Sequence, residues 1–257
     1  LMVFRCIFFS RIGFLLRHWQ HPLVSSTVKT VYNNPQFWLG YIGILKNEMN
    51  TVLYYAHDPM CSWCWGFEET KKSLFSSLPK ALAVHRLLGG LAADTDQPMP
   101  EDMQLHLQKT WQHIEEKIPG VKFNFDFWRL CQPRRSTYPA CRAVIAARQQ
   151  GSEYDEIMTA GIQRAYYQEA RNPSDNETLI EIAEEIGLNA AHFRRDLHVD
   201  ATEQSLAQEI HLTRKLQADS FPGLVLKIDD TSWPIAIDYL DASSMLELIE
   251  MLLENSK

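Results

Sequence analysis

The sequence has little of several features that define large classes of protein. It contains five cysteines in 257 residues, too few for a secreted scaffold held together by disulfides. Its formal net charge is -7, which argues against a general affinity for nucleic acid or anionic membranes. It contains no internal repeat and no low-complexity tract. With 46% hydrophobic residues, the chain has the composition of a globular protein with a sizeable core.

Long uninterrupted apolar runs are missing from the first 48 residues. Arg11 interrupts the apolar start, no small-x-small cleavage site follows closely, and the uncharged run from Thr30 to Leu45 is too short to span a bilayer. This segment carries a net charge of +4, whereas the remainder carries -11. We interpret residues 1–48 as an N-terminal extension outside the fold, with Met49 as the native first residue. Without a convincing leader, we expect a cytoplasmic protein whose cysteines are kept reduced.

The residues after this segment predict a compact βαβ unit. Residues 51–56 (TVLYYA) are short, β-branched and aromatic, which is typical of a buried strand, and His57-Asp58-Pro59 ends it. A helix is expected from Cys61 to about Leu78, and a second strand over 82–88 is ended by two glycines. Strands joined in this way run parallel.

Helical periodicity dominates the next 120 or so residues, before strands return. It predicts helices over 103–118, 138–150 and 154–170, one with a capping box at Ser174 and Glu177, and two more before residue 217. A hairpin is expected over 222–238, and Asp241 is expected to cap a final helix. The predicted class is therefore α/β, with residues 49–94 and 218–257 forming a sheet domain and residues 95–217 a helical domain inserted into it.

The segment HDPMCSWCWGF (57–67) carries the most specific chemical signal, because Cys61 and Cys64 lie at the junction of strand and helix. A thiol is nucleophilic only as a thiolate, and a helix N-terminus stabilises thiolates. Cys61 is thus the candidate attacking thiol, expected to be exposed, and Cys64 the candidate resolving thiol. Half of a zinc site and two inert core thiols remain open, although Cys131 and Cys141 do not form a second C-x-x-C pair.

The same segment resembles the active-site motif of the DsbA-like thioredoxin-fold oxidoreductases, in particular their FrnE-like and cytosolic branch. LLGGLA, RRSTYPACRAV, QRAYYQEARNPSD and FPGLVL resemble further motifs of that group, and the similarity covers about residues 50–255. The resemblance implies a thioredoxin fold with a large all-helical domain inserted between its βαβ and ββα halves. It also implies a protein-disulfide oxidoreductase or isomerase that works through a mixed disulfide.

This resemblance further implies that the protein needs no metal and no cofactor beyond its own dithiol. Its expected partners are disulfide-containing proteins or low-molecular-weight thiols such as glutathione, without nucleic acid or membrane. Two other functions stay open. One is a glutathione-linked transferase or isomerase of the same superfamily, whose 2-hydroxychromene-carboxylate isomerase and kappa transferase members use a serine-type site. The other is a non-enzymatic metal-binding or adaptor protein.

Several residues receive roles from the resemblance. It places a cis-proline, Pro222, opposite the Cys61 sulfur, and it gives the Phe221 backbone a role in pairing with a bound peptide. Ser62 and Trp63 depart from the Pro-His or Pro-Trp dipeptides of many relatives, so the reduction potential cannot be transferred.

Five residues are candidates from their position alone. Trp63 is expected to be exposed and to offer substrates an apolar contact. His57 and Asp58 are candidates for influencing the Cys61 thiol or relaying a proton, although capping of the turn is an equal explanation for Asp58. Arg134 and Arg135 suit either the carboxylate of glutathione or of an acidic peptide, or a solvated basic loop.

Overall fold

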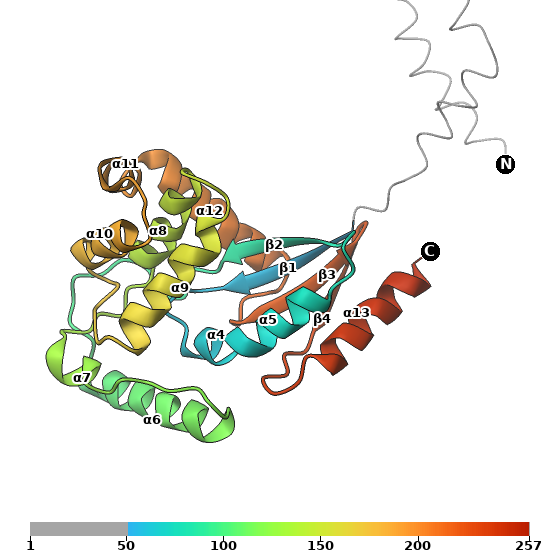
Figure 1. Ribbon diagram of the computed structural model, residues 1–257, viewed down its shortest axis with the longest axis horizontal. Helices are drawn as coiled ribbons and strands as arrows, with labels where there is room; N and C mark the ends of the chain where they lie inside the picture. The colour runs from blue at the N-terminus through green and yellow to red at the C-terminus, as the bar shows by residue number, and fades with distance from the viewer. Residues whose placement is uncertain (1–50, 257) are drawn as a thin grey trace, which may run out of the picture. The chain divides into compact units, whose positions relative to one another are not determined.

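The computed structural model describes residues 51–256, so the predicted extension over residues 1–48 lies outside the described part of the chain. Its sheet has the strand order β2-β1-β3-β4 (Figure 1). The strands are β1 (Thr51–His57), β2 (Ala83–Leu88), β3 (Gly223–Ile228) and β4 (Thr231–Ile235). β1 and β2 are parallel, as predicted for a βαβ unit, whereas β3 is antiparallel to both β1 and β4.

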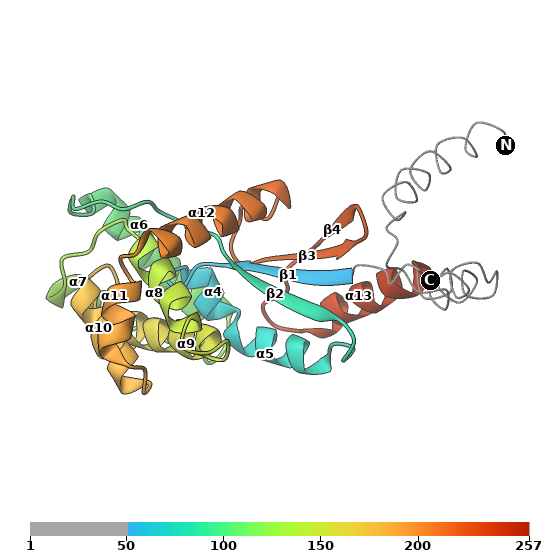
Figure 2. The ribbon, with the colours of Figure 1, turned by 90° about the horizontal axis from the view of Figure 1, so that it is seen from above.

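The central strand β1 is covered on both faces. Leu53 and Tyr55 are buried on the side of α5 (Glu68–Ser77) and α13 (Ser243–Asn255), which pack together below the sheet in Figure 2. Helix α12 (Asp200–Lys215) packs on β2 from the other side, where Ala56 joins a second apolar cluster. Because both faces of β1 are covered, both carry apolar side chains. Residues 51–56 are therefore a continuous apolar run in the sequence, without alternation of polar residues.

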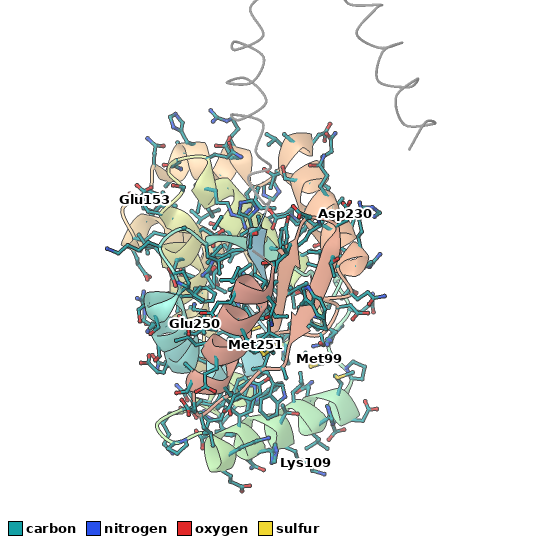
Figure 3. All side chains as sticks on the ribbon, turned by 90° about the vertical axis from the view of Figure 1, so that its right-hand side faces the viewer. Met99, Lys109, Glu153, Asp230, Glu250 and Met251 are labelled. Carbon is teal, nitrogen blue, oxygen red and sulfur yellow. The ribbon has the colours of Figure 1, made fainter. Side chains whose placement is uncertain are left out.

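Seven helices of the described chain lie between β2 and β3, which confirms the predicted helical insertion. They are α6 (Glu101–Lys117), α7 (Phe127–Leu130), α8 (Tyr138–Arg148), α9 (Tyr154–Tyr167), α10 (Asn176–Glu185), α11 (Ala190–Asp196) and α12. Their core includes Val144, Ile162 and Phe193, none of which is exposed. Figure 3 shows α6, marked by Lys109, at the bottom of the view, below Glu250 and Met251 of α13. The limits 94/95 and 217/218 between the two parts stay predictions.

The single helix expected over residues 61–78 is wrong. The structure has a short α4 (Ser62–Gly66) and a separate α5, divided at Phe67. Glycine is a poor helix former, and at Gly66 a Cβ atom would lie 2.8 Å from the Ile118 side chain. The close approach of Ile118 therefore favours glycine where the helix breaks, and the Phe67 ring turns into the core against Tyr55 and Tyr239.

Two predicted helix caps differ in detail. The Ser174 hydroxyl donates to the Ser136 carbonyl at 2.7 Å, and Asp175 occupies the N-cap position of α10, so the predicted capping box is wrong. Asp241 does accept the Ser243 N–H at 2.9 Å, although Ala242 is the N-cap residue of α13. At Ser174 a distant partner, Ser136, takes the hydroxyl that would otherwise cap the helix.

A buried ion network joins the sheet to the inserted helices. Arg86 of β2 donates to Asp155 of α9 at 2.5 Å, and Arg148 of α8 bridges Asp155 and Glu209 of α12. The Glu209 carboxylate also accepts the Leu88 N–H at 2.7 Å. The network thereby fixes the end of β2, from which the chain continues into the site. Within the described residues, no helix has the length and apolarity needed to cross a membrane.

Candidate active site

A tight turn after β1 presents Cys61 at the start of α4. The Cys61 N–H donates to the Asp58 carbonyl at 3.0 Å, and the Met60 N–H donates to Asp58 Oδ1 at 2.8 Å. Cys61 is the N-cap residue, and its carbonyl accepts the Trp65 N–H at 3.1 Å. Cys61 therefore lies at the positive end of α4, where the sequence pattern placed it, although its sulfur makes no capping hydrogen bond.

The two thiols of the pair lie in different surroundings. Both are free cysteines, and Cys61 Sγ donates to the Phe221 carbonyl at 3.4 Å. Cys61 lines a cavity, whereas Cys64 is fully buried behind it. Burial and the contact with Cys61 raise the pKa of Cys64 well above its usual value, so this group rests as a thiol. Cys61 itself is only 6% exposed, so the expectation of an openly exposed thiol is wrong.

The loop before β3 forms one wall of the site. It brings Phe221 beside Cys61, and the Phe221–Pro222 peptide bond is cis. Pro222 is buried, and the polar contact to Cys61 comes from Phe221 instead. Gly89 packs against the Phe221 ring so closely that a Cβ atom would lie 2.0 Å from it. A glycine at position 89 is therefore needed for the ring to occupy this place.

The cavity next to Cys61 has a volume of about 250 Å³ and a mixed lining. Met60, Leu91, Met99 and Leu107 supply apolar surface, and α6 adds His106 and Thr110. Arg134 and Arg135 both reach its wall. An apolar pocket with a few convergent polar groups is the usual form of a small-ligand site.

Arg134 and Arg135, which the sequence treats as one basic pair, differ in whether their charge is paired in the structure. Arg134 Nη2 donates to the Ser174 carbonyl and to Asp175 Oδ1, both at 2.6 Å, so its charge is already paired. Arg135 forms no ion pair within residues 51–256 and is only partly buried. Arg135 is thus the cation available to an anionic group in the cavity.

Trp63 also lines the cavity, but it is half-buried and not exposed as expected. Its ring lies 5.0 Å from that of Tyr239 and 5.9 Å from that of His113, with Lys117 Nζ 5.7 Å from its centroid. The difference follows from tertiary packing, because His113 of α6 and Tyr239, which precedes α13, both pack against Trp63 in α4. Only part of the indole remains available to a ligand.

Ser62 makes a contact that the sequence pattern did not reveal. Its hydroxyl oxygen accepts the indole N–H of Trp111 at 2.9 Å. Trp111 is fully buried in the aromatic cluster of the helical unit. Helical periodicity identified Trp111 as a core residue of α6, but nothing in the sequence indicated its partner.

Asp58 holds together three segments that are distant in sequence. Besides the Met60 N–H, its carboxylate accepts the Leu91 N–H at 2.7 Å, the Thr137 hydroxyl at 2.6 Å and the Cys141 thiol at 3.5 Å. Burial raises the pKa of Asp58, and these hydrogen bonds partly offset that rise. The motifs containing Leu91 and Thr137 are therefore fastened to the turn that precedes Cys61.

His57 lies behind this turn and is almost completely buried. Its ring stacks on Tyr55 at 5.0 Å with an interplanar angle of 3°. Burial, followed by the nearby charges of Arg86, Lys71 and Arg148, lowers the pKa of His57 well below its ordinary value. The imidazole is therefore neutral at physiological pH. Neither His57 nor Asp58 belongs to the cavity wall.

The other described cysteines are also free thiols, each with its own partner. Cys131 is partly buried and donates to the Ala170 carbonyl at 3.0 Å, while Cys141 donates to Asp58. Burial raises the pKa of both. No group of three or more His, Cys, Asp or Glu side chains in the described part of the chain is arranged to hold a metal ion.

Known proteins share both the sequence pattern and the fold. A family model described as Thioredoxin matches residues 54–234. Curated relatives named ClpXP adapter protein SpxH are 23% identical over 188 residues in Halalkalibacterium halodurans and over 173 residues in Bacillus subtilis. These alignments cover 72% and 67% of this chain but only 61% and 56% of the relatives, so the chain spans less than two thirds of their length.

Solved structures match over a larger share. One from Nitrosomonas europaea has a TM-score of 0.70 and 24% identity, covering 80% of this chain and 99% of its own. The cytosolic disulfide reductase DsbM from Pseudomonas aeruginosa has a TM-score of 0.63 and 25% identity, covering 79% and 99%. A DsbM structure with GSH also matches, with a TM-score of 0.60. The chain therefore belongs to the thioredoxin family and has the DsbA-like form of the fold, with helices inserted between the two halves of its sheet.

Proposed function

We propose that this protein is a thiol–disulfide oxidoreductase in which Cys61 attacks and Cys64 resolves. The observation that carries the proposal is the asymmetry of the pair. Cys61 caps a helix N-terminus and lines a cavity, whereas Cys64 is enclosed one turn later and held as a thiol. A cavity-lining thiol at a helix N-terminus and a fully buried partner suit a two-step exchange.

In the proposed cycle, the Cys61 thiolate attacks one sulfur of a substrate disulfide. A Cys61–substrate disulfide forms, and the second substrate sulfur leaves as a thiolate that takes up a proton. Cys64 then loses its proton and attacks Cys61, which releases the first substrate sulfur as a thiol. The substrate gains two electrons and two protons, and the enzyme is left with a Cys61–Cys64 disulfide. Two glutathione molecules restore the dithiol and become glutathione disulfide, and the reverse sequence oxidises a dithiol.

The surrounding residues take supporting roles in this proposal. The backbone at Phe221 and Pro222 offers an edge along which an extended substrate lies, and the accessible part of Trp63 offers it apolar surface. The Asp58 charge contributes to the raised pKa of Cys64, and the neutral His57 adds no positive charge behind the pair. The cycle requires no group beyond the dithiol itself.

Low-molecular-weight thiols such as glutathione are the proposed small partners, beside disulfide-containing proteins. The solved DsbM structure with GSH supports this class of ligand, and so does the volume of about 250 Å³ next to Cys61. Arg135 is the proposed partner for a glutathione carboxylate because its charge is unpaired within the described chain. The name of the cytosolic DsbM also favours the cytoplasm as the location.

Reduction of insulin by the wild-type protein and by the variants Cys61→Ser and Cys64→Ser tests the proposal. Loss of activity in both variants is expected, together with a trapped mixed disulfide in Cys64→Ser. Activity that survives in Cys61→Ser would refute it. A glutathione-linked transferase or isomerase requires Cys61 alone, so turnover of a glutathione-dependent substrate that persists in Cys64→Ser would favour that alternative.

An adaptor is the second candidate, favoured by the similarity to relatives named ClpXP adapter protein SpxH. In that case the protein binds a protein partner and needs no redox cycle. The variant carrying Ser at both Cys61 and Cys64 separates the two functions. An adaptor keeps its affinity for the partner in a pull-down with this variant, whereas an oxidoreductase loses its covalent complex.

A further inference from the structure

We propose that Trp111 is a positioning residue for the redox pair, and that its hydrogen bond to Ser62 favours the dithiol form. This inference rests on the proposed oxidoreductase function. Ser62 lies between the two cysteines, so any shift of its backbone changes how their sulfur atoms approach. The donor comes from α6 of the helical unit, so the inserted helices would take part in setting the redox equilibrium.

The geometry makes this hydrogen bond costly to lose. The distance from Trp111 Nε1 to Ser62 Oγ is 2.9 Å, and both side chains are buried. An indole N–H left without an acceptor in such surroundings loses its solvation without replacement. The bond therefore restrains the turn between the cysteines more firmly than an exposed one would.

Trp111 is itself held rigidly. Its ring stacks on Phe123 at 4.8 Å and lies 4.9 Å from Trp128 and 5.5 Å from both Tyr166 and Tyr167. Closely packed aromatic rings leave the indole little freedom to follow a movement of Ser62 in α4. The indole N–H of Trp111 is consequently fixed in position, and Ser62 is the partner whose position can change.

The hydrogen bond occurs together with two free thiols. Formation of the Cys61–Cys64 bond draws the two sulfur atoms together and thereby moves the backbone at Ser62, whose hydroxyl is tied to the fixed indole. The bond to Trp111 is accordingly assigned as stronger in the dithiol form. Its loss shifts the equilibrium with glutathione toward the disulfide by about fivefold, the usual net worth of one buried hydrogen bond.

Titration with glutathione redox buffers, with the fraction of disulfide read from alkylation and mass spectrometry, measures this shift. Ser62→Ala and Trp111→Phe are each expected to move the midpoint about fivefold toward disulfide. The double variant moves it no further, because both changes remove the same bond. Ser62→Thr keeps the hydroxyl and restores most of the wild-type midpoint.

Trp128→Phe is the matched control. Trp128 belongs to the same aromatic cluster, but its buried Nε1 has no hydrogen-bond partner in the described chain. Removing that N–H is expected to leave the midpoint unchanged. In the wild type, the indole N–H resonance of Trp111 is also expected to move between dithiol and disulfide forms, while that of Trp128 does not.

A wild-type midpoint in Ser62→Ala overturns the inference, as do equal shifts in Trp128→Phe and Trp111→Phe, or additive shifts in the double variant. The comparison of Ser62→Ala with Ser62→Thr decides the matter if Trp111→Phe does not fold. A wild-type protein that never forms the Cys61–Cys64 disulfide instead refutes the proposed function. The two failures are therefore distinct.

Discussion

The Phe221 carbonyl oxygen lies 3.4 Å from the Cys61 sulfur, although the two residues are 160 positions apart. The inserted helices separate them in sequence, and pairing of β3 with β1 brings them together in space. Ala56, near the end of β1, faces Gly223 at the start of β3. This register places the loop before β3 directly over the turn after β1.

Gly89→Ala is expected to disturb that contact, since the added Cβ would lie 2.0 Å from the Phe221 ring. The ring must move, which costs about 1–3 kcal/mol of unfolding free energy and lowers insulin reduction several-fold. Denaturant unfolding and the activity assay measure the two effects. Gly151→Ala is the control, because its Cβ would meet only the flexible carboxylate of Glu153. Equal effects in the two variants would contradict the explanation.

The reduced protein should be alkylated at Cys61 well before Cys64. Cys61 lines the cavity, whereas Cys64 is inaccessible and its pKa is raised by burial. Time-resolved labelling with iodoacetamide at pH 7, followed by peptide mass spectrometry, measures the order. We expect at least tenfold faster labelling of Cys61. Faster labelling of Cys64 in the folded protein would reverse the assigned roles.

Arg135→Gln is expected to raise the KM for glutathione disulfide several-fold with a smaller effect on kcat. The charge-assisted hydrogen bond to a carboxylate contributes to binding in the ground state and the transition state alike. Arg129→Gln is the matched control, because Arg129 is exposed, pairs with Asp126 and lies outside the cavity wall. If both variants keep the wild-type KM, the proposed carboxylate contact is wrong.

His57 should make the fold less stable in mild acid. Its folded-state pKa lies well below its ordinary value of about 6.5, so below that pH the unfolded chain binds a proton that the folded chain does not. Stability therefore falls as pH falls below about 6.5, by up to about 1.4 kcal/mol per pH unit.

His57→Phe tests this dependence while keeping a ring to stack on Tyr55. Denaturant unfolding at pH 7.5, 6 and 5 should give a flatter profile in this variant than in the wild type. His211→Gln, at an exposed position, should leave the profile unchanged. A profile in His57→Phe as steep as that of the wild type would assign the acid sensitivity to other groups.

Asp155→Ala should be among the more destabilising polar substitutions in the chain. It leaves Arg86 and Arg148 without their shared carboxylate in partly buried surroundings, at a cost of about 3 kcal/mol in unfolding free energy. Glu177→Ala removes the exposed ion pair with Arg194 and should leave stability almost unchanged. Comparable midpoints for the two variants in denaturant would show that burial does not set the difference.

The sequence by itself determined the local framework of the protein. Alternating and continuous apolar runs predicted β1, β2 and the β3–β4 hairpin, and helical periodicity predicted the insertion between them. The strand-to-helix junction placed Cys61 at the start of α4. Family resemblance, and not periodicity, directed attention to Phe221 and Pro222. These features depend on neighbours in sequence or on a known motif, so one chain suffices to find them.

Only the tertiary structure decided which distant groups meet at the site. In the tertiary structure Trp111 donates a hydrogen bond to Ser62, and Leu91, Thr137 and Cys141 all donate to Asp58. Trp63 packs against α6. The structure also pairs Arg134 and leaves Arg135 facing the cavity. Periodicity states which face of an element is apolar but not which element covers it. The partner of a side-chain hydrogen bond depends on which element covers that face, so periodicity does not predict it.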